Sequence, residues 1–124
     1  MKKLLFVCGF LLAATPAFAD FSTCFEPYPP AAINGNTATK EQMEQGVKDV
    51  KQFIRDSDDY QQCMNGQLKA MQIDAMHSKD TTPVDPSIVT MVNDKIHKNQ
   101  ALKERVGAEF NTAVQVFNAK HKGQ

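Results

Sequence analysis

Cysteines are the first side chains of this 124-residue chain that could carry chemistry, and there are three of them. Cys8 falls in an N-terminal run typical of a signal peptide, which leaves Cys24 and Cys63 for the folded protein. Their spacing is not C-x-x-C, and no histidine neighbours either one. Two cysteines in an exported chain predict one structural disulfide between Cys24 and Cys63. A metal pair, a redox pair and two free thiols are the alternatives.

The histidines do not form a metal-binding pattern. Three occur, widely spaced along the chain: His77, His97 and His121. We expect them at separate levels of an elongated molecule, and therefore predict surface histidines and no metal site. Asp94, His97 and Glu104 share one helix face, which could orient a general base. No serine or cysteine nucleophile lies nearby, so we predict that the chain is not an enzyme and holds no cofactor.

The densest charge cluster lies near the middle of the chain: Arg55, Asp56, Asp58 and Asp59. Neighbouring carboxylates can bind calcium or act as acid and base, but the glycine and distal glutamate of an EF-hand are absent. We interpret the cluster as a solvated helix face.

Methionines at helical spacing are interpreted as core residues and not as a copper site: Met43, Met64, Met71 and Met91.

The N-terminus has the pattern of a secretory signal peptide. Two lysines precede an apolar run over residues 4–14, and Ala17-Phe18-Ala19 is a small-x-small cleavage site. The apolar run is too short to cross a bilayer, which takes about 20 residues. Val7 stands where a lipid anchor at Cys8 would need a small residue. We predict a signal peptide over residues 1–19, a periplasmic or secreted location, and neither a membrane span nor a lipid anchor.

The charge balance argues against a nucleic-acid partner. The chain has 14 basic and 14 acidic residues, and no basic patch is interleaved with aromatic side chains. Its length fits one small domain, which we assign to residues 20–124. A domain of this size often needs a staple such as a disulfide, because its core is small.

The elements that position these residues are two helices. Thr39-x-x-Gln42 is a capping box, and the apolar stripe behind it predicts a helix over residues 40–77. Ser57, Asp58 and Asp59 could instead cap a separate helix, so a break there is the alternative. Asp85 as N-cap and Pro86 as first helical residue begin a second helix that extends to residue 120.

Two long helices joined by a short turn should pack antiparallel. Residues 39–124 therefore form an all-α helical hairpin, in which we expect Met64 level with Gln100 to Leu102. Gly107 costs about 1 kcal/mol relative to alanine inside a helix. We interpret this glycine as marking the close approach of another backbone.

The leader over residues 20–38 is rich in proline and therefore extended, because each proline fixes φ and restrains the residue before it. Asn34-Gly35-Asn36 is predicted to form a turn. Cys63 lies beside the apolar stripe, so we expect the disulfide to tether the leader along the flank of the hairpin. The residues predicted to pack in this contact are Phe25, Tyr28, Ile33, Phe53 and Tyr60.

Several segments resemble a group of small exported alphaproteobacterial proteins without an assigned activity. They are Cys24 near Pro27 and Pro30, Thr39-x-x-Gln42-Met43, Phe53-Ile54, Tyr60-Gln61-Gln62-Cys63 and Leu102-Lys103-Glu104-Arg105-Val106-Gly107. The resemblance covers most of the chain after residue 19 and implies no chemistry. The T-x-x-Q run is also similar to that of periplasmic stress chaperones of the Spy and CpxP type.

These patterns favour a small exported protein that acts through protein contacts. We predict a non-enzymatic interaction or structural module that binds a protein partner or associates with itself as a homodimer. The alternative is a periplasmic chaperone or stress-linked holdase, which would offer an apolar concave face to unfolded clients. A binder of a small ligand or metal is the third hypothesis.

Overall fold

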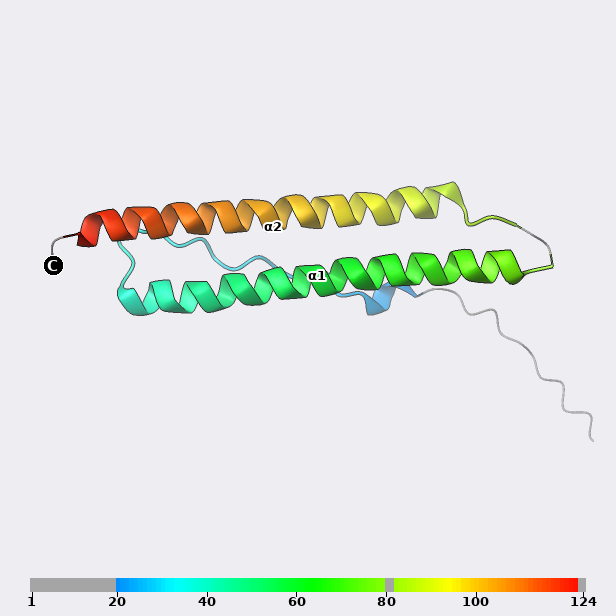
Figure 1. The fold of residues 1–124 in the computed structure, drawn as a ribbon, viewed down its shortest axis with the longest axis horizontal. Coiled ribbons are helices and arrows are strands. Elements are labelled where there is room, and N and C mark those ends of the chain that lie inside the picture. The colour runs from blue at the N-terminus through cyan, green and yellow to red at the C-terminus, as the bar shows by residue number, and fades with distance from the viewer. Residues whose placement is uncertain (1–19, 80–81, 123–124) are drawn as a thin grey trace, which may run out of the picture.

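Two long helices lie side by side and antiparallel along the molecule (Figure 1). The structure is a computed structural model that describes residues 20–79 and 82–122. Helix α1 spans Lys40–His77, helix α2 spans Pro86–His121, and one 3-10 turn, η1, spans Phe21–Thr23. No strand occurs among these residues, which confirms the predicted all-α hairpin. The predicted signal peptide, residues 1–19, lies outside the described residues.

Both helices begin at the predicted caps. The Thr39 hydroxyl accepts from the Gln42 backbone N–H at 3.2 Å, and the Gln42 side chain accepts from the Thr39 N–H at 2.8 Å. Asp85 accepts from the Ser87 N–H at 2.8 Å, with Pro86 as the first residue of α2. These bonds satisfy N–H groups that have no partner within the helix.

Helix α1 is continuous, so the alternative break near Ser57 does not occur. The reason is that Ser57 faces the hairpin seam, where its side chain is fully buried. Asn99 Nδ2 donates to Ser57 Oγ at 3.4 Å, and Gln61 Nε2 donates to Asn99 Oδ1 at 2.8 Å. The Ser57 hydroxyl therefore bonds to Asn99 of the opposite helix. It does not cap the start of a separate helix, and α1 continues through this position.

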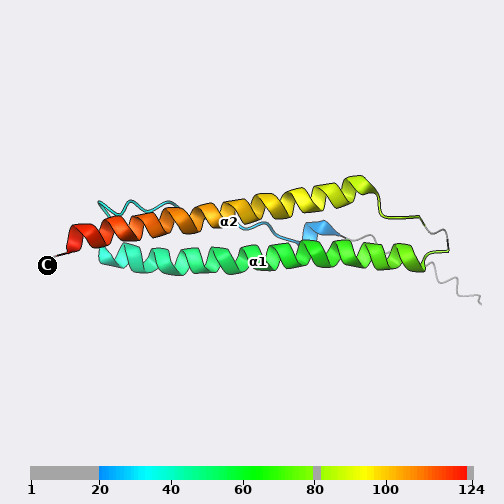
Figure 2. The ribbon, with the colours of Figure 1, turned by 45° about the horizontal axis from the view of Figure 1, so that its top comes forward.

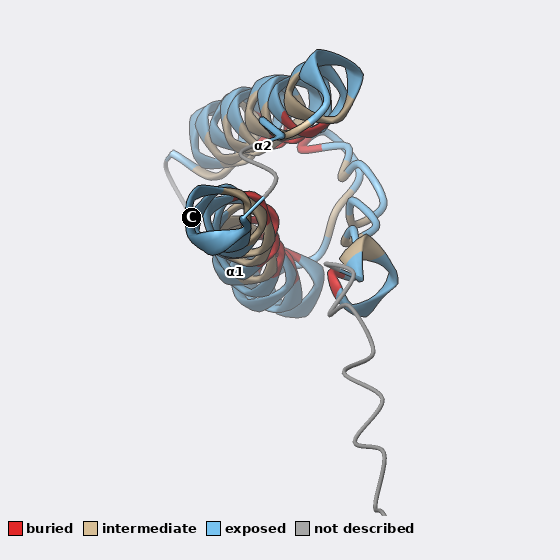
Figure 3. Cartoon of the chain, turned by 90° about the vertical axis from the view of Figure 1, so that its right-hand side faces the viewer, coloured by how far each residue is buried: buried red, intermediate tan, exposed pale blue. Residues whose placement is uncertain are grey.

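Apolar residues form a cluster on each side of this buried polar pair. The larger one contains Tyr60, Met64, Leu68 and Val92, together with Cys24 of the leader. The smaller one contains Val50, Phe53 and Val106. Viewed along the helices, the buried positions face inward (Figure 3).

The register differs from the expected one by about a helical turn. Gln61, and not Met64, lies level with Asn99 and Gln100, since its amide donates to both side chains. Met64 instead packs in the cluster that contains Val92. Pairing of the polar side chains sets this register, and the apolar stripes alone could not determine it.

The leader forms a third layer on one side of the hairpin (Figures 2 and 3). It runs from η1, beside the middle of α1, back to the start of α1 (Figure 1). The predicted turn is present: the Asn34 carbonyl accepts from the N–H groups of Thr37 and Ala38. Among the described helices, none is long and apolar enough to pass through a membrane.

Candidate functional site: the tethered leader and its two cavities

Cys24 and Cys63 form the predicted disulfide, which closes a sequence separation of 39 residues. Their Cα atoms lie 5.6 Å apart. Cys24 is buried in the same cluster as Tyr60 and Met64, and Phe21 of η1 packs against that cluster. The disulfide therefore joins the leader to the core, and it also fixes where the leader starts along α1.

Burial along the leader repeats every third residue. Cys24 is buried, Pro27, Pro30 and Ile33 are partly buried, and each pair of residues between them is exposed. A period of three is that of the polyproline II helix, which the prolines of this segment favour. The lengths agree, since nine residues of polyproline II span about 28 Å. The stretch of α1 from Cys63 to Gly46 is about 26 Å long.

This period corrects the prediction for two aromatic residues. Phe25 and Tyr28 were expected to pack on α1, but they are 84% and 93% exposed. Both lie one position after an inward-facing residue, so they occupy the same outward ridge of the polyproline helix. Their Cα atoms are one turn, or about 9 Å, apart. The sequence prediction failed because it took apolar character as a sign of burial and did not apply the three-residue period.

The other three predicted packing residues do pack against the hairpin, two of them in the core. Phe53 lies in the smaller cluster and Tyr60 in the larger one, each 3% exposed. Ile33 packs further along, where a methyl group added to Gly46 would collide with Ile33 Cδ1 and come within 2.8 Å of Phe110. Because Gly46 has no side chain, Ile33 of the leader and Phe110 of α2 can both pack against this position of α1.

The close approach occurs at Gly46 and Gly35, not at Gly107. Gly35 abuts the backbone of α2, because a methyl group there would collide with the Ala113 carbonyl oxygen. At Gly107, the same group would meet no packing neighbour within 4 Å. The sequence did contain a sign of the contact at Gly46. This glycine lies three residues after Met43 and four before Val50, on the buried face of α1. Lys120 Nζ donates to the Asn36 carbonyl and fastens the turn to α2.

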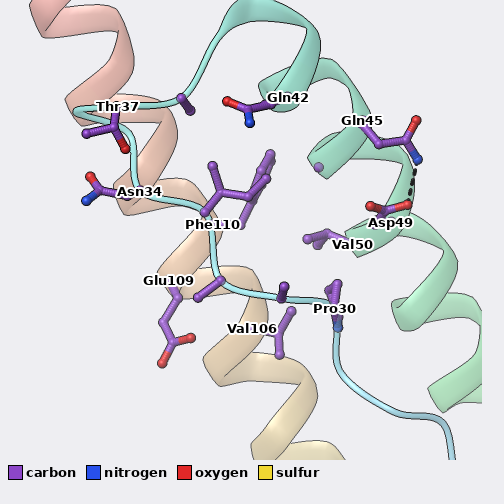
Figure 4. A pocket seen from close by; sticks show the side chains of 15 residues that line it. Pro30, Asn34, Thr37, Gln42, Gln45, Asp49, Val50, Val106, Glu109 and Phe110 are labelled. Atoms are coloured by element: carbon purple, nitrogen blue, oxygen red, sulfur yellow. Dashed lines mark hydrogen bonds between the residues drawn. The ribbon is translucent and has the colours of Figure 1, made fainter.

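A cavity of about 360 Å³ lies where the leader crosses between the two helices. Phe110, Val50 and Val106 form apolar parts of its lining (Figure 4). Gln45 Nε2 donates to Asp49 Oδ1 at 2.7 Å at one rim, and the Glu109 carboxylate points away from Phe110 (Figure 4). We call this space the Phe110 cavity.

A second cavity, of about 370 Å³, lies beside the disulfide. The disulfide, Pro27 and Tyr60 line it together with Phe25 of the outward ridge. Three carboxylate residues also line it: Glu26 from the leader, and Asp56 and Asp59 from α1. Burial, and secondarily the charge of Glu26, raises the pKa of the Tyr60 hydroxyl above its usual 10.0. We call this space the disulfide cavity.

The histidines lie at separate levels, as expected. His77 Nδ1 hydrogen-bonds the Ile73 carbonyl at the end of α1, and His121 Nδ1 hydrogen-bonds the Phe117 carbonyl at the end of α2. His97 is exposed near the middle of α2. Within residues 20–79 and 82–122, no three His, Cys, Asp or Glu side chains are grouped so that they could hold a metal ion.

Two residues of the set considered for a general base, Asp94 and Glu104, make other contacts. Asp94 forms an ion pair with Lys98 at 2.7 Å, and Glu104 accepts from Gln100 Nε2 at 2.8 Å. The hydrogen bond and charge of Asp94 raise the pKa of Lys98.

The acidic cluster of α1 has two roles. Asp58 bridges to Lys103 of α2 at 2.5 Å, with the lysine side chain only 18% exposed. Asp56 accepts from Gln52 Nε2 at 2.6 Å and faces the disulfide cavity with Asp59. The prediction of a uniformly solvated face was therefore incomplete, because helical spacing separates Asp58 from its two neighbours.

Comparisons with protein-family models, curated proteins and solved structures found no match to this chain. Its function must therefore be inferred from the leader, the two cavities and the helices themselves.

Proposed function

We propose that the chain is a small exported, non-enzymatic module that binds a protein partner through its leader. The observation that carries the proposal is the exposure of Phe25 and Tyr28, 84% and 93%, on one ridge of a proline-stiffened segment. Aromatic side chains dominate the energetics of protein interfaces. A single exposed aromatic residue would mean little, but two on one fixed ridge make a recognition surface.

The rigidity of the leader supports this role. The disulfide holds one end, the Gly35 and Gly46 contacts hold the other, and three prolines stiffen the segment between them. Binding through a preorganised segment avoids the entropy cost of ordering it. Polyproline II segments are recurrent ligands of apolar grooves for the same reason.

The arrangement favours an interaction module over the holdase alternative. A holdase would need an open apolar face, whereas the leader lies along one side of this hairpin. Other exposed apolar side chains, such as Ile73, Met76 and Met91, belong to the end of α1 and the start of α2.

The test is a comparison of captured proteins. The native chain, isolated from the envelope of the source cell, is immobilised beside a Phe25→Ser/Tyr28→Ser variant and a Met76→Ser control. Met76 is 72% exposed and lies near the end of α1. We expect one or more envelope proteins to be retained by the native chain and the control but lost from the double variant. Equal retention by all three proteins would contradict the proposal.

Export has its own test. The disulfide suits an oxidising compartment, and Ala17-Phe18-Ala19 forms the proposed cleavage site. We expect N-terminal sequencing of the protein from the periplasm or medium to begin at Asp20. A protein recovered from the cytoplasm with an intact N-terminus would contradict this location.

A further inference from the structure

The disulfide cavity has features that the proposed aromatic ridge does not use. It opens beside Phe25, so a partner on the ridge would also cover the cavity. Its volume, about 370 Å³, falls in the lower part of the range of about 300–1,000 Å³ typical of ligand pockets. Its lining combines the disulfide and the apolar Pro27 with the carboxylate residues Glu26, Asp56 and Asp59.

The Tyr60 hydroxyl is a polar group of the cavity lining. Tyr60 is 3% exposed and lines the cavity. No hydrogen bond to its hydroxyl exists among the described residues, although a buried tyrosine usually finds a partner. Tyr60 and Glu26 line the same cavity. The described residues contain no fully buried side-chain polar atom without a partner, so this hydroxyl is in contact with solvent, and a ligand in the cavity can hydrogen-bond to it.

The negative charge of the lining is only partly compensated. No lysine or arginine lines the cavity among the described residues. Within the described part of the chain, the Glu26 and Asp59 carboxylates form no ion pair or side-chain hydrogen bond, and the Asp56 carboxylate accepts from Gln52. The Glu26 charge contributes to raising the pKa of Lys98 on α2. The Lys98 ammonium group, however, forms its ion pair with Asp94, at 2.7 Å.

We propose that the disulfide cavity receives the guanidinium group of an arginine on the partner protein. This inference rests on the proposed function and names the side chain that the partner inserts beside the ridge. The carboxylates supply the negative charge, the Tyr60 hydroxyl accepts a further N–H, and Phe25 offers an aromatic ring at the cavity mouth.

Guanidinium matches this lining better than a compact cation does. It is planar, has five N–H donors, and both stacks on aromatic rings and pairs with carboxylates. The acidic groups are not clustered closely enough to form a metal site among the described residues. A second copy of this chain would bring like charges together if it docked with the same acidic surface, which costs free energy.

The experiment uses Tyr60 as its own reporter. The chain has no tryptophan and two tyrosines, so Tyr60 is the only tyrosine fluorophore in a Tyr28→Phe variant of the exported, disulfide-bonded protein. This variant is titrated with N-acetyl-arginine amide and, as the uncharged analogue, with N-acetyl-citrulline amide. Spermidine tests whether a free polyamine is the ligand instead.

We expect a saturable change in Tyr60 emission with the arginine compound and an affinity about tenfold weaker or more with citrulline. Asp56→Asn/Asp59→Asn should weaken arginine binding by about tenfold or more. Glu44→Gln/Asp49→Asn removes the same charge from α1 outside this cavity and should leave binding unchanged. Equal binding of arginine and citrulline, tighter binding of spermidine, or equal loss in both variants would overturn the proposal.

The two proposals fail separately. If Phe25 and Tyr28 are needed for partner capture but Asp56→Asn/Asp59→Asn captures the partner normally, the arginine site is wrong and the interaction module stands. If N-acetyl-arginine amide binds as expected but no protein depends on the aromatic ridge, the proposed function is wrong.

Discussion

Asn99 Nδ2 donates to Ser57 Oγ at 3.4 Å across the hairpin seam, and neither side chain is exposed to solvent. Gln61 completes the arrangement by donating to Asn99 Oδ1. This polar group separates the two apolar clusters and sets the level at which α1 and α2 pair, as a buried asparagine does in coiled coils. The described chain contains no buried side-chain polar atom without a partner.

Asn99→Ala should lower the free energy of unfolding by about 1–3 kcal/mol, because it removes the Asn99 side chain that donates to the buried Ser57 hydroxyl and one of the two acceptors of the Gln61 amide. Urea denaturation measures the loss. A double-mutant cycle with Ser57→Ala should show a coupling energy between Asn99 and Ser57. Asn93→Ala, at an exposed position of the same helix, should change the stability little. Equal effects of the two alanine variants would show that the buried pair does not stabilise the hairpin.

Removal of the disulfide should cost about 4 kcal/mol in the chain-entropy model for a loop of this length. Cys24→Ser/Cys63→Ser and the reduced native protein should melt at similar temperatures, both below the oxidised protein. Reductant should not affect the double variant, which serves as the control. If oxidised and reduced native protein melted together, the leader would not stabilise the fold.

Two glycines of α1 should respond in opposite directions to alanine. Gly46→Ala forces a methyl group against Ile33 and Phe110, and overpacking of this kind costs about 1–3 kcal/mol. Gly66→Ala meets no atom within 4 Å and should stabilise the helix by about 0.4–1 kcal/mol. Chemical denaturation of both variants tests this, and a stabilising Gly46→Ala would contradict the packing described for the leader.

The aromatic ridge should be dispensable for folding. Phe25→Ser/Tyr28→Ser changes exposed side chains, so each substitution should alter the free energy of unfolding by less than about 0.5 kcal/mol. Phe53→Ala empties a core position and should cost about 3–5 kcal/mol. A thermal melt distinguishes the two cases. Marked destabilisation of the ridge variant would mean that these aromatic residues pack in solution.

The start of α2 should weaken in acid. The Ser87 backbone N–H, which donates to Asp85, lowers the pKa of this carboxyl below its usual 3.8. Because the folded pKa is the lower one, ionised Asp85 stabilises the fold above pH 3.8. This contribution is lost as the pH falls through the folded pKa.

Melting temperatures between about pH 2 and pH 6 measure this effect. Asp85→Asn keeps an acceptor for the Ser87 N–H but does not titrate, so its melting temperature should fall less steeply below pH 3.8 than that of the native chain. Parallel curves for the two proteins would show that Asp85 does not contribute to the acid dependence. Asp20, whose pKa the Ser22 hydrogen bonds also lower, remains in both proteins.

Local signals in the sequence determined most of the architecture. The capping box at Thr39, the Asp85-Pro86 start and two stripes with helical spacing predicted both helices within one residue of their observed ends. The pairing of Cys24 with Cys63 was also predicted from the sequence, because the assignment of Cys8 to a signal peptide left two cysteines to pair. Helix caps and helical spacing depend on residues close together in the chain, and the disulfide prediction depends on the number of cysteines. Neither requires knowledge of the tertiary structure.

Only the tertiary structure decided how these parts meet. The register depends on which polar groups satisfy one another across the seam, and the apolar stripes allow more than one answer. The fate of the leader's aromatic residues depends on the polyproline period, which turns Phe25 and Tyr28 outward while Cys24 and Ile33 face the hairpin. Glu26, Asp56, Asp59 and Tyr60 share a cavity because the disulfide brings the leader beside α1. Such contacts join residues far apart in the chain, and their geometry exists only once the helices and the leader have packed.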